Sequence, residues 1–193
     1  YASKLSSAVE DIDLNLEDFV VKLNSDVLGK VVNIGSRLGS IAHKKLSGEL
    51  TTIPEDAKEM LASISGLSDD IAEAYESLTY NKAMRLIMGG ADAANRYIDA
   101  TAPWSVVKTD PDKAAQICTA GLNAFKMLMG YLKPVLPEMA AGAEAYLNCK
   151  MPLWSDITAP LENQAFNPYT HLAGRLQLED VSYLTESLTR EPR

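Results

Sequence analysis

The stretch LNLEDFVVKLNSDVLGKVVNIGSRLGSIAHKKL (residues 14–46) is the longest helix-compatible run in the chain, and it contains no proline. Its apolar residues recur in steps of three and four, which places them on one stripe of a helix. The stripe consists of Phe19, Leu23, Val27, Val31, Ile34, Leu38, Ile41 and Ala42. The sequence therefore predicts a long helix that packs by this stripe and forms the spine of a helical bundle. Ser47 and Gly48 are expected to end it.

The opposite face of this predicted helix is basic. Residues 22–45 carry one acid, Asp26, against five basic side chains: Lys22, Lys30, Arg37, Lys44 and Lys45. Near the centre of the helix, Asn33 and Arg37 are four residues apart, so their side chains lie one turn apart on the same face. From patterning alone, Arg37 is first interpreted as a solvated surface residue, with a ligand contact as the alternative.

The charge of the whole chain is distributed unevenly. The formal net charge is −8, which argues against a general nucleic-acid-binding protein, and no DNA partner is expected. Residues 49–80 carry eight acids and one base, Lys58. A polyanion should therefore approach along the basic first helix and be repelled from the second one.

Further helices follow along the chain. Apolar periodicity and end signals predict them over residues 52–78, 80–100, 111–133 and 138–147, with a short last helix over 178–188. Pro54 suits a first helical turn, as does Pro111 after the predicted N-cap Asp110. Prolines and glycine punctuate the irregular residues 148–177, and no alternating strand pattern is present. We predict an all-α bundle of about five main helices over residues 14–193, preceded by residues 1–13 as the end of an earlier segment.

Several function classes find no support in the residues. No apolar run approaches the roughly 18–20 residues that span a membrane, and the N-terminus has no signal-peptide core. Cys118 and Cys149 form no metal-binding pattern, and buried reduced thiols fit the cytosol. No phosphate-binding loop, metalloprotease motif or catalytic constellation occurs. The acidic cluster of Glu10, Asp11 and Asp13 could bind a cation or form a solvated loop.

One tryptophan lies in a predicted break between two helices. Pro103 fixes its own backbone and is expected to push Ala102 into an extended conformation, which would hold Trp104 on a stiff segment. The Trp104 ring could cap the core or form a stacking platform, and the pattern leaves both interpretations open.

These features combine into a more specific resemblance. Seven sequence words occur in one order along the chain: KLSS (4–7), DIDLNLEDFV (11–20), KVVNIGSR (30–37), ANRYID (94–99), APW (102–104), YLKPVLP (131–137) and NPY (167–169). In these words the chain resembles the C-terminal part of bacterial methionyl-tRNA synthetases. The resemblance implies an α-helical anticodon-binding domain of the class I synthetase type, with residues 167–193 folding back towards the rest of the enzyme. Residues 1–13 would then be the end of the preceding catalytic-side domain.

The resemblance also implies a function. The parent enzyme would be a cytoplasmic methionine–tRNA ligase that uses ATP and magnesium, with zinc allowed, to attach methionine to tRNA. This chain would lack the catalytic domain and be inactive alone, and its partners would be methionine tRNA with anticodon CAU and that catalytic domain. By resemblance, Asn33 and Arg37 would read the first anticodon base, Pro103 and Trp104 would face them, and Arg175 would lie near the anticodon.

Two alternatives to this function remain at this point. The chain could be the anticodon-binding domain of another class I synthetase. It could also be a non-enzymatic helical module that binds a partner protein.

Overall fold

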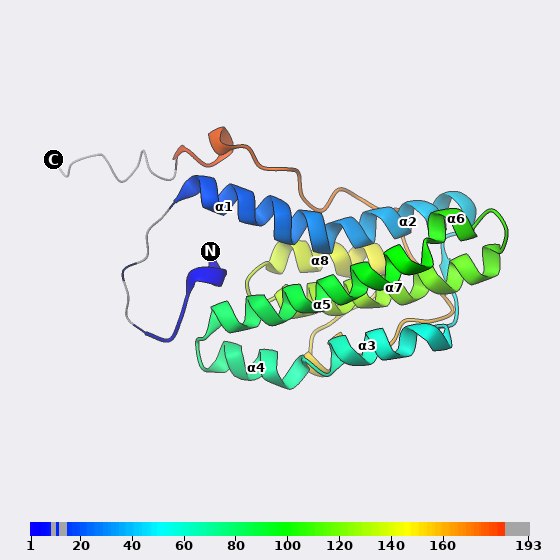
Figure 1. The fold of residues 1–193 in the computed structure, drawn as a ribbon, viewed down its shortest axis with the longest axis horizontal. Helices are drawn as coiled ribbons and strands as arrows, with labels where there is room; N and C mark the ends of the chain where they lie inside the picture. Colours follow the sequence, from blue (N-terminus) through cyan, green and yellow to red (C-terminus); the bar gives the residue numbers. More distant parts are fainter. Residues whose placement is uncertain (9–10, 12–14, 184–193) are drawn as a thin grey trace.

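A computed structural model of the chain describes residues 1–8, 11 and 15–183. The long helices run side by side along the long axis of the molecule (Figure 1). The helical elements are η1 (Ala2–Lys4), α1 (Leu16–Lys22), η2 (Leu23–Val32), α2 (Asn33–Lys45), η3 (Glu55–Ala57), α3 (Lys58–Ser65), α4 (Ser68–Glu76), α5 (Tyr80–Thr101), α6 (Pro103–Val106), α7 (Pro111–Leu132), α8 (Pro137–Leu147), η4 (Trp154–Ile157) and η5 (Leu178–Asp180). The predicted all-α bundle is confirmed.

The first helical stretch is continuous from Leu16 to Lys45 and forms α1, η2 and α2. The Asn15 side chain caps its start by accepting a hydrogen bond from the Asp18 N–H at 2.9 Å. The stretch ends as predicted, because Ser47 and Gly48 adopt positive φ angles of 67° and 69°. Its middle is a π-helical segment, η2, which the sequence analysis did not predict. Wider turns of this kind are often found at functional sites.

The spine of the bundle is α7, and the prediction that the first helix forms it is wrong. Every residue of α7 from Ile117 to Leu132 is buried, so this helix meets neighbours on all sides. The first stretch, in contrast, keeps one face in solvent. Close packing depends on small residues: a Cβ atom on Gly121 of α7 would lie 2.1 Å from the Leu38 side chain of α2.

The second predicted helix, residues 52–78, is wrong as a single helix. The structure has the 3₁₀ turn η3 followed by α3 and α4, with a break at Gly66 and Leu67. The Leu67 N–H bonds to the Ile64 carbonyl three residues back, which tightens the chain there. Glycine favours a helix end because it loses much backbone freedom inside a helix. The break lets α3 and α4 each pack a buried face against α5, along the lower side of the bundle in Figure 1.

Three smaller predictions also need correction. Two short strands, β1 (Glu49–Leu50) and β2 (Gln164–Ala165), pair antiparallel, although no strand was expected. Ala102 is left-handed (φ 42°, ψ 60°) and not extended, because its N–H caps α5 through Ile98 while its carbonyl starts α6. The predicted helix over 178–188 begins as the 3₁₀ turn η5, and residues 184–188 lie outside the described chain.

Other helix predictions hold. Helices α5, α7 and α8 match the predicted ranges within two residues, and the Asp110 side chain caps α7 by accepting from the Lys113 N–H at 3.0 Å. Cys118 is a buried free thiol as predicted, whereas Cys149 is a free thiol that is only half-buried. None of the helices in the described ranges is long and apolar enough to cross a bilayer. Glu10 and Asp13 of the acidic cluster lie outside the described residues.

Candidate nucleic-acid interface

Arg37 and Trp104 meet on the surface where α2 packs beside α6. The Arg37 Cζ atom lies 4.6 Å from the centroid of the Trp104 ring, a cation–π geometry. The Arg37 guanidinium also reaches Asp99 of α5, with 3.6 Å between Nη2 and Oδ1. Trp104 is 38 % exposed, so the ring is neither enclosed in the core nor free in solvent. Two residues 67 positions apart in sequence thus form one partly exposed cation–π pair.

Pro103 holds Trp104 in place and does not itself reach the surface. It is buried at the first position of α6, where a proline costs no hydrogen bond. The Ser105 and Val106 N–H groups both donate to the Ala102 carbonyl, at 2.9 and 3.2 Å. A stiff turn of helix therefore sets the direction of the indole ring.

Asn33 and Arg175 line a shared groove next to this surface. The groove has a volume of about 620 Å³ and lies between the η2–α2 stretch and the extended segment 169–177. In Figure 1 this C-terminal segment runs along the outer side of α1 and α2. Ser36 and His171 also line the groove, so polar side chains face it from both walls. Within the described residues, no hydrogen bond of the Asn33 side chain and no ion pair of Arg175 is present.

The inner end of the groove rests on aromatic residues. The Tyr169 ring packs edge-on against Tyr146 of α8, with 5.2 Å between the ring centroids. Burial raises the pKa of the Tyr169 phenol above its ordinary value. Tyr146 in turn donates a hydrogen bond to the Gly35 carbonyl of α2 at 3.0 Å, so the aromatic side chain that contacts Tyr169 is itself fixed between α8 and α2.

The basic face is more nearly neutral than the sequence suggested. Lys22 pairs with Asp26, and Lys30 pairs with Asp92 of α5, each at 2.8 Å. With the Arg37–Asp99 pair, three of the five bases therefore face a carboxylate. Lys44 and Lys45 are exposed, and neither forms an ion pair with another described residue. The last turn of α2 is thus the part of this face with the most unbalanced positive charge.

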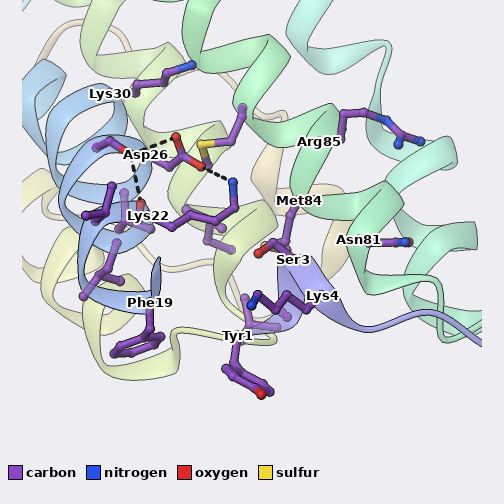
Figure 2. A pocket seen from close by; sticks show the side chains of 18 of the residues that line it. Tyr1, Ser3, Lys4, Phe19, Lys22, Asp26, Lys30, Asn81, Met84 and Arg85 are labelled. Carbon is purple, nitrogen blue, oxygen red and sulfur yellow. Dashed lines mark hydrogen bonds and ion pairs between the residues drawn. The ribbon is translucent and has the colours of Figure 1, made fainter. Parts of the chain in front are cut away.

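A larger hollow lies elsewhere, between α1, η2, α5 and the end of α7. It has a volume of about 1260 Å³, and none of the five predicted site residues lines it. Figure 2 shows Phe19 and Lys22 from α1 and Met84 and Arg85 from α5 among its lining residues, with Tyr1 at its rim. Its lining is mainly apolar, and its charged residues are of both signs.

The structure thus gathers four of the five predicted residues on one side of the bundle. Asn33 and Arg37 occupy successive turns of α2, with Trp104 beside Arg37 and Arg175 across the groove from Asn33. Pro103 is buried at the start of α6, next to Trp104 in the chain. No group of three or more His, Cys, Asp or Glu side chains in residues 1–8, 11 and 15–183 is arranged to hold a metal ion.

Sequence reasoning missed the residues that support this surface. Asp92 and Asp99 of α5 pair with bases on the first helical stretch, and Asn24 contacts the C-terminal segment. The signal for Asn24 was weak: an asparagine with low helix propensity in the interior of a long helix.

Comparison with known proteins gives consistent results. Residues 48–168 match the sequence model of a family described as the anticodon binding domain of methionyl tRNA ligase. That range contains Pro103 and Trp104, while Asn33, Arg37 and Arg175 lie outside it. The methionine–tRNA ligase of Bdellovibrio bacteriovorus is 41 % identical over 186 residues, which make up 96 % of this chain and 27 % of that protein.

Solved structures agree at the level of the fold. The free-state methionyl-tRNA synthetase of Mycobacterium tuberculosis superposes with a TM-score of 0.77 at 21 % identity, over 85 % of this chain and 35 % of that one. The same enzyme in complex with methionyl-adenylate gives a TM-score of 0.75 at 20 % identity, over 81 % and 33 %.

Proposed function

The chain belongs to the family of anticodon-binding domains of methionyl-tRNA ligases, and on this premise we propose that it reads the CAU anticodon of a methionine tRNA. The reading surface consists of Asn33 and Arg37 of α2, Trp104 of α6 and Arg175 of the C-terminal segment. The observation that carries the proposal is the Arg37–Trp104 pair, a guanidinium held 4.6 Å from an indole centroid beside a polar groove. Unstacked bases are usually bound by such aromatic faces together with hydrogen bonds to the base edge.

The chemistry of α2 suits a cytosine at the first anticodon position. The Watson–Crick edge of cytosine has acceptors at N3 and O2 and a donor at N4. Arg37 has only donors and can address N3 or O2, whereas the Asn33 amide can both donate and accept. Uracil carries an N–H group at position 3. This donor would face the N–H donors of Arg37, and no hydrogen bond could form between them. We assign discrimination at the first base to Asn33 and Arg37.

Trp104 and Arg175 supply the other contacts. The exposed face of Trp104 stacks a loop base, which contributes about 1–3 kcal/mol for such pairs. Arg175, on the far wall of the groove from Asn33, approaches the loop from the opposite side. Lys44 and Lys45 attract the tRNA backbone, while the acidic α3 and α4 disfavour docking on the other side.

The wider protein follows from the same proposal. The chain corresponds to only about a quarter of the length of its 41 % identical relative. We infer a cytoplasmic methionine–tRNA ligase in which another domain binds ATP and magnesium, with zinc allowed, and attaches methionine to tRNA. In this proposal residues 1–13 end that domain and residues 167–193 fold back towards it, and the 193-residue chain alone is inactive. Family membership favours this function over that of another class I synthetase.

Tryptophan fluorescence tests the stacking surface. The chain has two tryptophans, so a Trp154→Phe variant leaves Trp104 as the only indole. A CAU anticodon stem-loop should quench its emission, and addition of salt should reverse the effect. A lack of salt-dependent binding to any tRNA would favour a protein-interaction module instead.

A second variant separates binding from folding. Trp104→Leu keeps an apolar side chain on α6 but removes the π face, and it should weaken stem-loop binding about 5- to 150-fold. If the melting temperature collapsed while the affinity per folded molecule stayed unchanged, Trp104 would be a core residue and not a stacking platform.

A further inference from the structure

Asn24 forms a two-point contact with the C-terminal segment. Its Nδ2 donates to the Leu176 carbonyl at 2.8 Å, and its Oδ1 accepts from the Leu176 N–H at 3.0 Å. The two residues are 152 positions apart in sequence. The amide therefore pairs with one residue's backbone as a neighbouring β-strand would, and it fixes both the position and the direction of the backbone there.

This contact is the main polar attachment of the segment. No backbone–backbone hydrogen bond in the described chain involves residues 168–176. Tyr169 packs on Tyr146, and the Leu172 side chain contacts the core close to Gly142 of α8. Beyond Leu172 the Asn24 amide holds the chain, one residue after Arg175.

Arg175 depends on this attachment because no described residue anchors its side chain. It is exposed, and no ion pair links it to another described residue. An exposed arginine binds weakly if both its backbone and its side chain must be ordered when the ligand binds, because that ordering costs conformational entropy. Fixing Leu176 orders the neighbouring backbone in advance and keeps Arg175 on the groove wall that faces Asn33.

We propose that Asn24 is a positioning residue for anticodon recognition, which acts by holding Arg175 across the groove from Asn33. The inference rests on the proposed function and adds a residue that touches no RNA itself. A purely structural Asn24 would contribute to the stability of the fold, and its loss would affect all ligands and all variants alike.

A double-mutant cycle on the 193-residue chain tests this role. Dissociation constants are measured for two RNA stem-loops, one with the anticodon CAU and one with UAU. Each is titrated with four proteins: wild type, Asn24→Ala, Arg175→Ala and the double variant. Asn24→Ala should weaken CAU binding about fivefold, and the same change in the Arg175→Ala background should have almost no effect. Full additivity of the two losses would overturn the proposal.

Two further measurements distinguish a local effect of Asn24 on the C-terminal segment from a general effect on the fold. The Leu176 amide should be protected from hydrogen exchange in wild type and lose that protection in Asn24→Ala, whether or not RNA is present. Asn95→Ala is the matched control, because Asn95 also bridges to η2, through the Lys30 carbonyl at 3.1 Å, but does not contact the C-terminal segment. It should leave CAU affinity per folded molecule unchanged, and a loss equal to that of Asn24→Ala would mean a general effect on the fold.

The outcomes separate the two proposals. If wild type prefers CAU and the cycle is additive, the role of Asn24 is wrong and the proposed function stands. If wild type binds CAU and UAU equally, the proposed function fails, and the positioning role fails with it.

Discussion

Arg37→Ala removes the guanidinium that joins α2 to Trp104 and to Asp99. In the free chain this loss should be small, because both partners are partly exposed. A cation–π contact at an exposed site contributes about 0.5–1 kcal/mol. An exposed ion pair contributes about 0.2–1 kcal/mol. We expect a total destabilisation of about 1 kcal/mol, which lowers the melting temperature of a chain of this size by about 2–4 °C.

The effect on RNA binding should be larger and dependent on sequence. A hydrogen bond from a charged donor to a desolvated base edge contributes about 1.5–3 kcal/mol. Arg37→Ala should therefore weaken CAU stem-loop binding about 10- to 150-fold and weaken UAU binding much less. Arg37→Lys keeps the charge but loses the planar fork, so it should recover part of the affinity and little of the discrimination.

Fluorescence anisotropy with labelled stem-loops, together with thermal unfolding of each variant, measures both effects. Lys44→Ala is the matched control, since it removes an exposed base from the same helix and should weaken all stem-loops alike. Equal weakening of every anticodon by Arg37→Ala would make Arg37 a phosphate contact and would refute its assignment to the first base.

Three other predictions concern stability. Gly39→Ala should destabilise the fold by about 2–3 kcal/mol in chemical denaturation, because its Cβ would lie 1.8 Å from the Tyr146 hydroxyl. Gly89→Ala, with nothing within 4 Å of the added Cβ, should instead stabilise α5 by about 0.5–1 kcal/mol, and a loss there would contradict the packing described. Burial raises the pKa of the Cys118 thiol to about 12 from its ordinary value near 9. The pKa of this thiol is higher in the folded state than in the unfolded state. Its contribution to the free energy of unfolding is therefore complete below pH 9 and is lost as pH rises towards 12. Unfolding titrations between about pH 8 and 10.5 should show a steeper alkaline loss for wild type than for Cys118→Val, and parallel curves would exclude this contribution.

Local rules explain most of the helices that the sequence predicted. Asp110 and Pro111 mark the start of α7, and Ser47 with Gly48 mark the end of α2, because caps and positive φ angles have strong residue preferences. The same rules did not identify α7 as the spine. A helix buried on all sides is recognised only when its neighbours are known, since its apolar stripe resembles that of a half-buried helix.

The errors in the fold have the same origin. Gly66 inside a periodic run is tolerated in many helices, and only the packing of α3 and α4 on α5 makes it a break. Ala102 adopts a left-handed conformation although it precedes a proline, because two helices share it as a cap. Such effects of tertiary context override local preference.

The candidate site was accessible from sequence in part. The spacing of Asn33 and Arg37 placed them on one helix face, but only the family resemblance associated them with Trp104 and Arg175. The Asn24–Leu176 contact spans 152 positions and involves a backbone group, so no side-chain pattern could reveal it. Asp92 and Asp99 were likewise seen as ordinary charges of α5 until the fold placed them beside Lys30 and Arg37.

The most direct test of the proposed function is a titration of the unaltered chain with two anticodon stem-loops that differ only at the first anticodon base. We predict that CAU binds at least about tenfold more tightly than UAU at the same salt concentration, because the Arg37 donors meet an acceptor in one and a donor in the other. Equal dissociation constants for the two stem-loops would contradict the assignment of this surface to anticodon reading.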